Sequence, residues 1–263
     1  KIATFSEVPP EIIYLILGHV LDPHDLLSFL LVFPHLAPHL SPAQTTAACD
    51  DGQTILHLLA RQEGNPRSLA TLLTNPTADP NIHAPRRKRS SLGWYPANST
   101  EMGSEKLSWH GSTPLSVAAY HGNLAAVKLL LAHPATIADS PGDSKNTPLS
   151  LAAHRGHLPI VSLLLAHPDV DPNHPDNNDR TPLILAASQG RSAVVAALLT
   201  HPDIALNLRT PESRSSLPRS TPLSAAATNG HAAVVALLLA RDGVETNPTN
   251  VYAFTPLWEA ARY

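Results

Sequence analysis

The feature that most constrains the fold is a tripeptide, Thr-Pro-Leu, that recurs along the chain at a nearly fixed interval. Successive copies are separated by 34, 34, 40 and 34 residues, and a degenerate copy, Thr54-Ile55-Leu56, lies 59 residues before the first. Such a period indicates a repeat architecture, in which each supersecondary unit buries its apolar face only against its neighbours. The five copies begin at Thr113, Thr147, Thr181, Thr221 and Thr255.

The unit that begins at Thr147 predicts two short helices. Thr147 can cap the first helix, and Pro148 suits its first position, where the backbone N–H would have no partner. Gly156 ends this helix because glycine tolerates the left-handed backbone that is needed there. Apolar residues from Ile160 to Leu165 then give a second helix its buried side. The stretch that follows is rich in Pro, Asn and Asp, which predicts a turn-forming connection.

This unit resembles the ankyrin repeat in its period, in Thr-Pro-Leu, and in the pairs Gly156-His157 and Gly230-His231. The resemblance covers about residues 50–263 and implies an all-α solenoid. We expect five complete repeats and part of a sixth that begins near Tyr252, and we expect the native chain to continue past Tyr263 into a polar capping end. The complete repeats begin near Asp51, His110, Ser144, Asn178 and Pro218.

Residues 5–40 lack this rhythm and predict a separate helical module. Apolar residues recur at helical spacing from Ile12 to Leu21, and Asp22-Pro23 predicts the start of a further helix. We therefore divide the chain into an N-terminal module at residues 1–42 and a repeat domain at 43–263, with residues 41–50 as a short connection.

The N-terminal module resembles an F-box in Val8-Pro9-Pro10-Glu11-Ile12, in Leu21-Asp22-Pro23-His24-Asp25-Leu26 and in Leu30-Leu31-Val32, although the usual basic residue and tryptophan do not follow. An F-box docks on the Skp-type adaptor of cullin–RING ubiquitin ligases. Alternatively, these helices only cap the N-terminal end of the solenoid. The resemblance implies adaptor-docking side chains at Pro9, Ile12, Ile16, Leu17, Leu26 and Leu30.

Composition excludes several classes of function. The net charge of −3 argues against general nucleic-acid binding, which needs a strongly basic surface. Cys49 is the only cysteine, so no intrachain disulfide is possible and an intracellular protein, cytoplasmic or nuclear, is expected. No apolar run approaches the roughly 20 residues that span a bilayer. No zinc spacing, phosphate loop or EF-hand loop is present, so we expect no metal and no cofactor.

Histidine is abundant, with 15 copies, but its placement indicates structural roles. His133, His167 and His201 share one position in the repeat and each precedes a proline. Equivalent residues of stacked repeats lie roughly 10 Å apart, too far to share a zinc ion. A histidine at the end of a helix suits the negative end of its dipole. His57 is expected to be structural as well.

The ankyrin resemblance implies that the two residues before each helix-ending glycine face the concave groove in which partners bind. We call these residues the groove stripe. The stripe changes from cationic and aromatic in the early repeats to neutral and polar in the later ones. Arg61 and Gln62 are the corresponding pair of the first repeat, although that repeat holds one extra residue before its glycine. The groove stripe comprises Tyr120, His121, His154, Arg155, Ser188, Gln189, Thr228 and Asn229.

Two insertions interrupt the repeats just before a Thr-Pro-Leu, at about residues 86–109 and 209–219. The first contains the basic run Arg86-Arg87-Lys88-Arg89, which suits a nuclear-import signal, a solvated tail or a clamp for an acidic ligand. It also contains Trp94, Tyr95 and Trp109, residue types that dominate binding hot spots. We expect these aromatic residues to fold over the groove near Tyr120, as against an inert surface loop.

Three functions are consistent with this organisation. The leading hypothesis is a non-catalytic adaptor that recruits the Skp-type adaptor of a ubiquitin ligase and binds a protein or peptide target, an acidic one if the basic run contacts it. The second is a plain ankyrin interaction module with capping N-terminal helices. The third is an enzyme with a small-molecule pocket under the first insertion, in which Tyr120, His121 and His154 act as acid or base and Arg155 holds an anion.

Overall fold

The computed structural model describes residues 15, 17–49, 52–64, 66–85, 111–210, 220–249 and 255–262, and these ranges contain helices but no β-strand. None of the described helices is long and apolar enough to cross a lipid bilayer. After residue 50 the helices come in pairs, as the all-α prediction requires. The first helices of the pairs are α4 (Ile55–Arg61), α6 (Pro114–His121), α8 (Pro148–Arg155), α10 (Pro182–Ser188), α12 (Pro222–Thr228) and α14 (Pro256–Arg262), and the second helices are α5 (Pro66–Leu72), α7 (Leu124–Ala132), α9 (Leu158–Leu165), α11 (Ser192–Leu199) and α13 (Ala232–Leu239).

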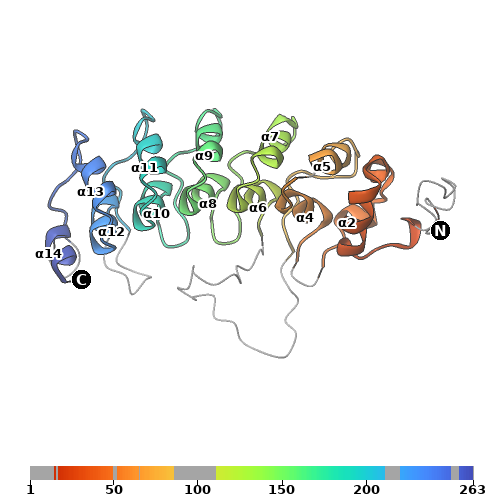
Figure 1. The fold of residues 1–263 in the computed structure, drawn as a ribbon, viewed down its shortest axis with the longest axis horizontal. Coiled ribbons are helices and arrows are strands. Elements are labelled where there is room, and N and C mark those ends of the chain that lie inside the picture. Colours follow the sequence, from red (N-terminus) through yellow and green to blue (C-terminus); the bar gives the residue numbers. More distant parts are fainter. Residues whose placement is uncertain are drawn as a thin grey trace, which may run out of the picture.

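The helix pairs stand side by side in one row (Figure 1). Each first helix from α6 to α12 packs against the first helices before and after it, and the second helices from α5 to α13 pack in the same order. The row is therefore a solenoid of two helical layers. Figure 1 shows that it bends, with the layer of first helices on the inner side.

The local signals of the sequence explain where each first helix begins and ends. The side-chain oxygen of Thr147 accepts a hydrogen bond from the backbone N–H of Ser150 at 3.3 Å, and Pro148 opens the helix. Helix α8 ends at Gly156, whose φ of 87° is left-handed. Both predictions for this repeat are confirmed. Thr113, Thr181 and Thr221 cap the equivalent helices in the same way.

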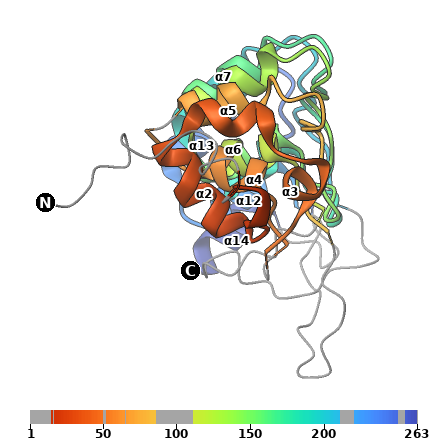
Figure 2. The ribbon, with the colours of Figure 1, turned by 90° about the vertical axis from the view of Figure 1, so that its right-hand side faces the viewer.

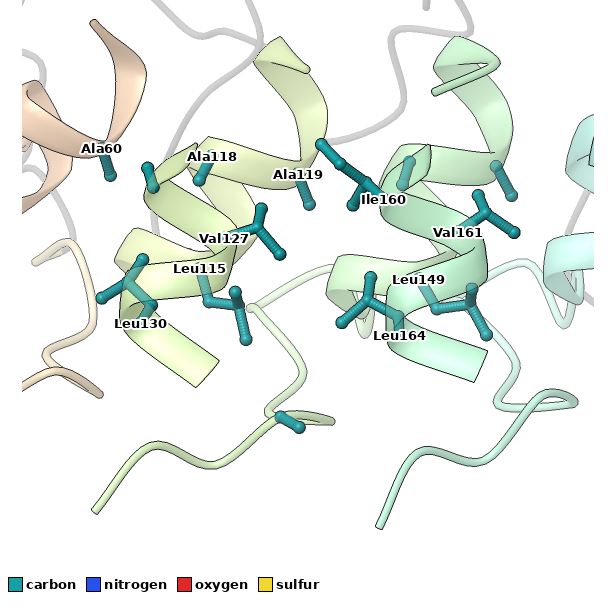
Figure 3. Packing of buried hydrophobic residues seen from close by; sticks show 14 of the residues in the cluster. Ala60, Leu115, Ala118, Ala119, Val127, Leu130, Leu149, Ile160, Val161 and Leu164 are labelled. Carbon is teal, nitrogen blue, oxygen red and sulfur yellow. The ribbon is translucent and has the colours of Figure 1, made fainter. Parts of the chain in front are cut away.

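One apolar core runs through the whole row. In each complete repeat from the second to the fourth, the first helix contributes a leucine and two alanines, and the second helix contributes at least one β-branched residue and a leucine. The small alanines let neighbouring first helices approach closely, as the sequence predicts. Figure 3 shows the pattern in two successive repeats, with Leu115, Val127 and Leu130 in one and Leu149, Val161 and Leu164 in the next.

A polar side chain just after the helix-ending glycine connects each repeat to the one before it, and we call these contacts the helix-end ladder. His157 donates from Nε2 to the carbonyl of Tyr120 at 3.0 Å, and His231 donates likewise to Ser188 at 3.0 Å. A Cβ on Gly122 would lie 2.7 Å from the ring of His157, so this ladder needs glycine there. At the same position, Asn123 donates to Gln62 at 2.7 Å and Arg191 donates to His154 at 3.3 Å.

A second set of contacts, the hairpin ladder, joins the connections between repeats. The side chain of Asn173 accepts from the backbone N–H of Ala205 at 2.8 Å and donates to the carbonyl of Asp203 at 2.7 Å. Asn81 and Asn207 make the same two contacts with the repeats that follow them.

Before the first pair lie α2 (Pro23–Val32), the 3-10 helix η2 (Pro34–His39) and α3 (Pro42–Thr46). Asp22 caps α2 by accepting the backbone N–H of His24 at 2.8 Å, as predicted. The prediction of a plain connection at residues 41–50 is wrong in one respect, because α3 forms there. Ser41 and Gln44 begin it with a capping box, in which each side chain satisfies the other's backbone N–H.

These N-terminal helices pack onto the first repeat (Figure 2). Helix α2 contacts α4, and η2 contacts α5. Two side chains of the first repeat complete this junction: Ser68 donates to the carbonyl of Leu30 at 2.8 Å, and Asn75 donates to the carbonyl of Leu40 at 3.0 Å. The N-terminal helices and the repeats therefore share one core, which supports the capping alternative.

This packing decides which N-terminal side chains a partner can reach. Of the predicted adaptor-docking residues, Leu17, Leu26 and Leu30 are buried, with 3%, 0% and 0% of their surface exposed, because the protein's own helices cover them. Pro9, Ile12 and Ile16 lie outside the described residues. Among the described N-terminal residues, the exposed large apolar side chains are Leu15, Leu21 and Val32.

Candidate functional site

The groove stripe follows the C-terminal ends of the first helices. Tyr120 and His121 end α6, and His154 and Arg155 end α8. Each repeat delivers two side chains to this line because the helix-ending glycine comes at the same place in every unit. The exposure of these side chains differs from the prediction, however. Arg155 is exposed, whereas Tyr120 and His154 expose only 6% and 5% of their surface.

Tyr120, His121 and Arg155 form one cluster across two repeats. The guanidinium carbon of Arg155 lies 4.2 Å from the centroid of the Tyr120 ring. The ring of His121 packs edge-on against the same tyrosine, with 5.2 Å between the ring centroids. The negative face of an aromatic ring attracts a cation, so Tyr120 restrains the exposed Arg155. The cluster is a positively charged surface on an apolar base.

His154 is buried in the middle of the stripe without a hydrogen-bond partner for either ring nitrogen among the described residues. A buried polar group without a hydrogen-bond partner lowers the stability of the fold by about 1–3 kcal/mol. Burial, and then the positive charges of Arg180, Arg155 and Arg191, lower the pKa of His154 to about 4. The imidazole is therefore neutral at neutral pH.

The pKa of His121 is lowered in the same way. Burial, followed by the positive charges of Arg61, Arg155 and His157, lowers its pKa to about 4. A general acid or base works best with a pKa near the operating pH, so neither histidine is tuned for proton transfer at neutral pH. The stripe also contains no carboxylate. The geometry thus suits binding by hydrogen bonds and positive charge.

The later half of the stripe is neutral and is partly bonded within its own helices. The hydroxyl of Ser188 donates to the carbonyl of Leu185 at 2.9 Å, and that of Thr228 donates to Ser224 at 2.8 Å. Gln189 and Asn229 are exposed. The charge of the stripe is therefore concentrated at α6 and α8.

Arg191 is a candidate site residue that the sequence reasoning missed. It is exposed, and it crosses Gly156 to donate from Nε to the carbonyl of His154 at 3.3 Å. The available signal was its position, since it replaces the histidine of the Gly-His pair. Arg61 lies further back on α4 and is also exposed. Within the described part of the chain, no ion pair is formed by Arg61, Arg155 or Arg191.

The predicted aromatic residues Trp94, Tyr95 and Trp109, and the basic run at 86–89, lie outside the described residues. The residues that flank both insertions are described. The backbone N–H of Ala84 donates to Ser112 at 2.9 Å, and that of Thr210 donates to Ser220 at 3.3 Å. In an uninterrupted repeat Asp176 makes the equivalent bond to Arg180, at 3.1 Å. Both insertions therefore depart from the same turn of the hairpin.

The His-Pro histidines have the structural role that was predicted. Nδ1 of each accepts the backbone N–H two residues further on, at 3.3 Å, and so completes the turn after the second helix. His57 is fully buried, and its Nε2 lies 2.8 Å from the carbonyl oxygen of Ser112 in the next repeat. Within the described ranges no three His, Cys, Asp or Glu side chains could together hold a metal ion. The histidines that accept these bonds are His133, His167 and His201.

A hollow of about 310 Å³ lies away from the groove stripe, between the hairpin after α11 and the end of α13. Its lining includes Leu206 and Arg241 and no residue of the stripe. The small-molecule alternative requires a closed pocket under Trp94 and Trp109. Because both lie outside the described residues, this alternative stays a prediction.

Comparison with known families matches the repeats that the structure shows. A family model of ankyrin repeats in three copies matches residues 94–176 and 115–210, and the single ankyrin-repeat model matches residues 51–84 and 219–251. Together these matches cover more than half of the chain. None of them includes residues 1–50, so the F-box resemblance of that stretch stays a prediction. No curated protein matches the chain.

Proposed function

Because this chain belongs to the ankyrin-repeat family, we propose that it is a protein-interaction module whose partner binds along the groove stripe. The observation that carries this proposal is Arg155, which is exposed and is held 4.2 Å from the centre of the Tyr120 ring. A side chain that is ordered before binding loses less entropy when the partner arrives. Arginine and tyrosine are also the residue types that dominate binding hot spots.

The rest of the stripe supports binding rather than catalysis. Its two histidines are neutral at neutral pH, and its later members are small polar side chains. The two ladders hold successive repeats in fixed register, which keeps the stripe in one line. A partner can therefore meet several repeats at once on a surface that needs little rearrangement.

The experiment selects peptides from a random displayed library with the purified chain and titrates synthetic copies against two variants. The groove variant, Arg155→Ala with Gln189→Ala, should weaken binding by about tenfold or more, since a hydrogen bond to a charged group is worth about 1.5–3 kcal/mol. The control variant, Lys128→Ala with Ser162→Ala, alters exposed residues of α7 and α9 and should bind normally. Binding that is lost in the control, or unchanged in both, would contradict the proposal.

We propose as a second function that the N-terminal helices dock on the Skp-type adaptor of a cullin–RING ubiquitin ligase. The observation that favours it is the exposure of three large apolar side chains, Leu15, Leu21 and Val32, which are 66%, 57% and 61% exposed. A partner that covered them would remove apolar surface from water. The docking residues would then be these three rather than the buried leucines of the core.

Co-elution of the purified chain with the adaptor tests this second function. A complex at micromolar concentrations that is lost in Leu21→Glu with Val32→Glu, while the fold is retained by circular dichroism, would support it. Absence of a complex with the unaltered chain would exclude the ligase role and leave the interaction module intact.

A further inference from the structure

The charges of the repeats are sorted by position. Between each capping threonine and the start of the second helix, the five complete repeats contain arginine and histidine but only one carboxylate, Glu63. The acidic residues lie instead in the connections between repeats, at positions such as Asp139, Asp171 and Asp203. Arginine therefore lies at or just after several of the helix ends that are nearly free of carboxylates, whereas the connections carry both acidic and basic residues.

The cations at these helix ends are not neutralised by the described part of the protein. Arg61, Arg155 and Arg191 are exposed, and no carboxylate lies within ion-pair distance of them there. Arg180 differs, because Asp176 pairs with it at 2.7 Å. Three guanidinium groups from the first, third and fourth repeats, at or just after the ends of the first helices, thus have no ion-pair partner among the described residues.

His154 adds a second, independent observation in the middle of the groove stripe. It is buried between α8 and its neighbours, and both ring nitrogens lack a hydrogen-bond partner among the described residues. The backbone carbonyl of His154 accepts a hydrogen bond from Arg191, and the next residue after His154 in the chain is Arg155. The buried imidazole is neutral and adds no charge of its own, so a ligand with acceptor atoms would meet the two exposed guanidinium groups beside it.

We propose that the partner presents an acidic peptide segment, whose carboxylates bind Arg61, Arg155 and Arg191. This inference rests on the proposed function, and it adds the chemistry of the partner. Arginine forms paired, charge-assisted hydrogen bonds with carboxylates, which makes it the preferred residue for this task. Adjacent repeats lie about 10 Å apart, and an extended chain advances about 3.3 Å per residue, so carboxylates about three and six residues apart match the three arginines.

A peptide fits better than a nucleic acid. The whole chain carries a net charge of −3, which disfavours the binding of a long polyanion. A short acidic segment meets only the arginine-bearing helix ends. Tyr120 also offers no exposed ring face on which a base could stack, since it is only 6% exposed and Arg155 lies over its ring.

The test titrates the full chain with a labelled peptide that carries glutamate at every third residue, with glycine between, and with its glutamine counterpart. The glutamate peptide should bind, more weakly as salt rises, and the glutamine peptide should not. Arg155→Gln with Arg191→Gln should weaken binding by about tenfold or more. Lys128→Gln, which removes an exposed charge on α7, should leave it unchanged.

Three results would overturn the inference: no binding of the glutamate peptide, equal binding of both peptides, or equal losses in the Arg155/Arg191 and Lys128 variants. Equally tight binding of single-stranded polyuridylate would assign the surface to nucleic acid instead. If library-selected peptides bind at the stripe while the glutamate peptide does not, the acidic partner is wrong and the proposed function stands. If neither binds there, both are wrong.

Discussion

Asp139 carries a carboxylate at the position where Asn81, Asn173 and Asn207 carry the amide of the hairpin ladder. One oxygen of Asp139 accepts the backbone N–H of Asp171 at 3.2 Å, and the other has no hydrogen-bond partner among the described residues. A carboxylate cannot donate to the neighbouring carbonyl as the amide does. Burial raises the pKa of Asp139, which means that the ionised carboxylate is less favourable in the folded protein than in water.

Asp139→Asn should therefore raise the free energy of unfolding by about 1 kcal/mol, because the amide restores the missing hydrogen bond. Urea denaturation at neutral pH measures the change. The converse variant, Asn173→Asp, should lower stability by a similar amount. A loss of stability in Asp139→Asn would show that the carboxylate has a partner that the ladder does not predict.

His121 and His154 give the protein a defined dependence on acid. Both have a pKa of about 4 in the folded state, against 6.5 for an ordinary histidine. Between these values the unfolded chain binds protons that the folded chain does not, so stability falls as pH drops from about 6.5 to about 4. The loss is on the order of 3 kcal/mol for the buried His154 and smaller for the half-buried His121, whose charge is screened by solvent, and these two groups add nothing further below that range.

Comparing the free energy of unfolding at pH 7 and pH 4 checks this expectation. His154→Leu should reduce the difference by on the order of 3 kcal/mol, since the more deeply buried of the two histidines is gone. An identical difference in the variant and the original chain would assign the acid sensitivity to other groups.

The repeat frame alone assigns residues to the groove stripe, but it could not predict how exposed they are. The position of Arg155 follows from Thr147 and Gly156, which are visible in the sequence. Its contact with Tyr120 joins two repeats and depends on the direction of both side chains. The burial of His154 likewise depends on neighbouring repeats, so no periodicity could show it.

At the scale of the element, two requirements place glycine after the first helices: a left-handed backbone and, at some of these positions, room for the side chain of the helix-end ladder. Gly122 and Gly230 occupy the same position and both have a left-handed backbone, with φ of 83° and 71°. A Cβ on Gly122 would strike His157 at 2.7 Å, whereas nothing described lies within 4 Å of a Cβ on Gly230. Comparing these two glycines therefore separates the need for a left-handed backbone, which both share, from the need for space beside the ring of His157, which only Gly122 has.

Gly230→Ala should cost about 1–2 kcal/mol of stability, the price of a left-handed backbone for a residue with a Cβ. Gly122→Ala should cost at least about 1 kcal/mol more, since it also displaces His157 from the carbonyl of Tyr120. Chemical denaturation of the two variants measures the difference. Equal costs would show that the ladder contributes nothing to stability.

Helix boundaries were predictable wherever the sequence places a cap and a stop. Thr147, Pro148 and Gly156 mark one such helix, and Asp22 marks α2. Helix α3 was missed although Ser41 and Gln44 have the spacing of a capping box. It spans only five residues, too few for an apolar period to appear.

At the scale of the whole molecule, the solenoid followed from the period, but the attachment of the N-terminal helices did not. Their junction depends on contacts between residues far apart in sequence, such as Ser68 with Leu30 and Asn75 with Leu40. Nothing in a local pattern encodes such pairs. The fold makes the N-terminal helices part of the solenoid's core.

Deleting residues 1–45 should therefore destabilise the repeats, because the apolar side chains of the first repeat lose their cover. A matched pair of substitutions isolates the effect: Leu26→Ala should cost about 2–5 kcal/mol, and Leu21→Ala, at a 57% exposed position, less than about 0.5 kcal/mol. Thermal unfolding of the three proteins gives the comparison. Repeats that unfold normally after the deletion would contradict a shared core.

The central claim is that a partner lies along the groove stripe, and amide hydrogen exchange with a library-selected peptide tests it most directly. Binding should slow exchange in the last turns of α6, α8 and α10 and in the turns that follow them, and leave the outer faces of α7 and α9 unchanged. Protection confined to α7 and α9, or to the N-terminal helices, would contradict the claim.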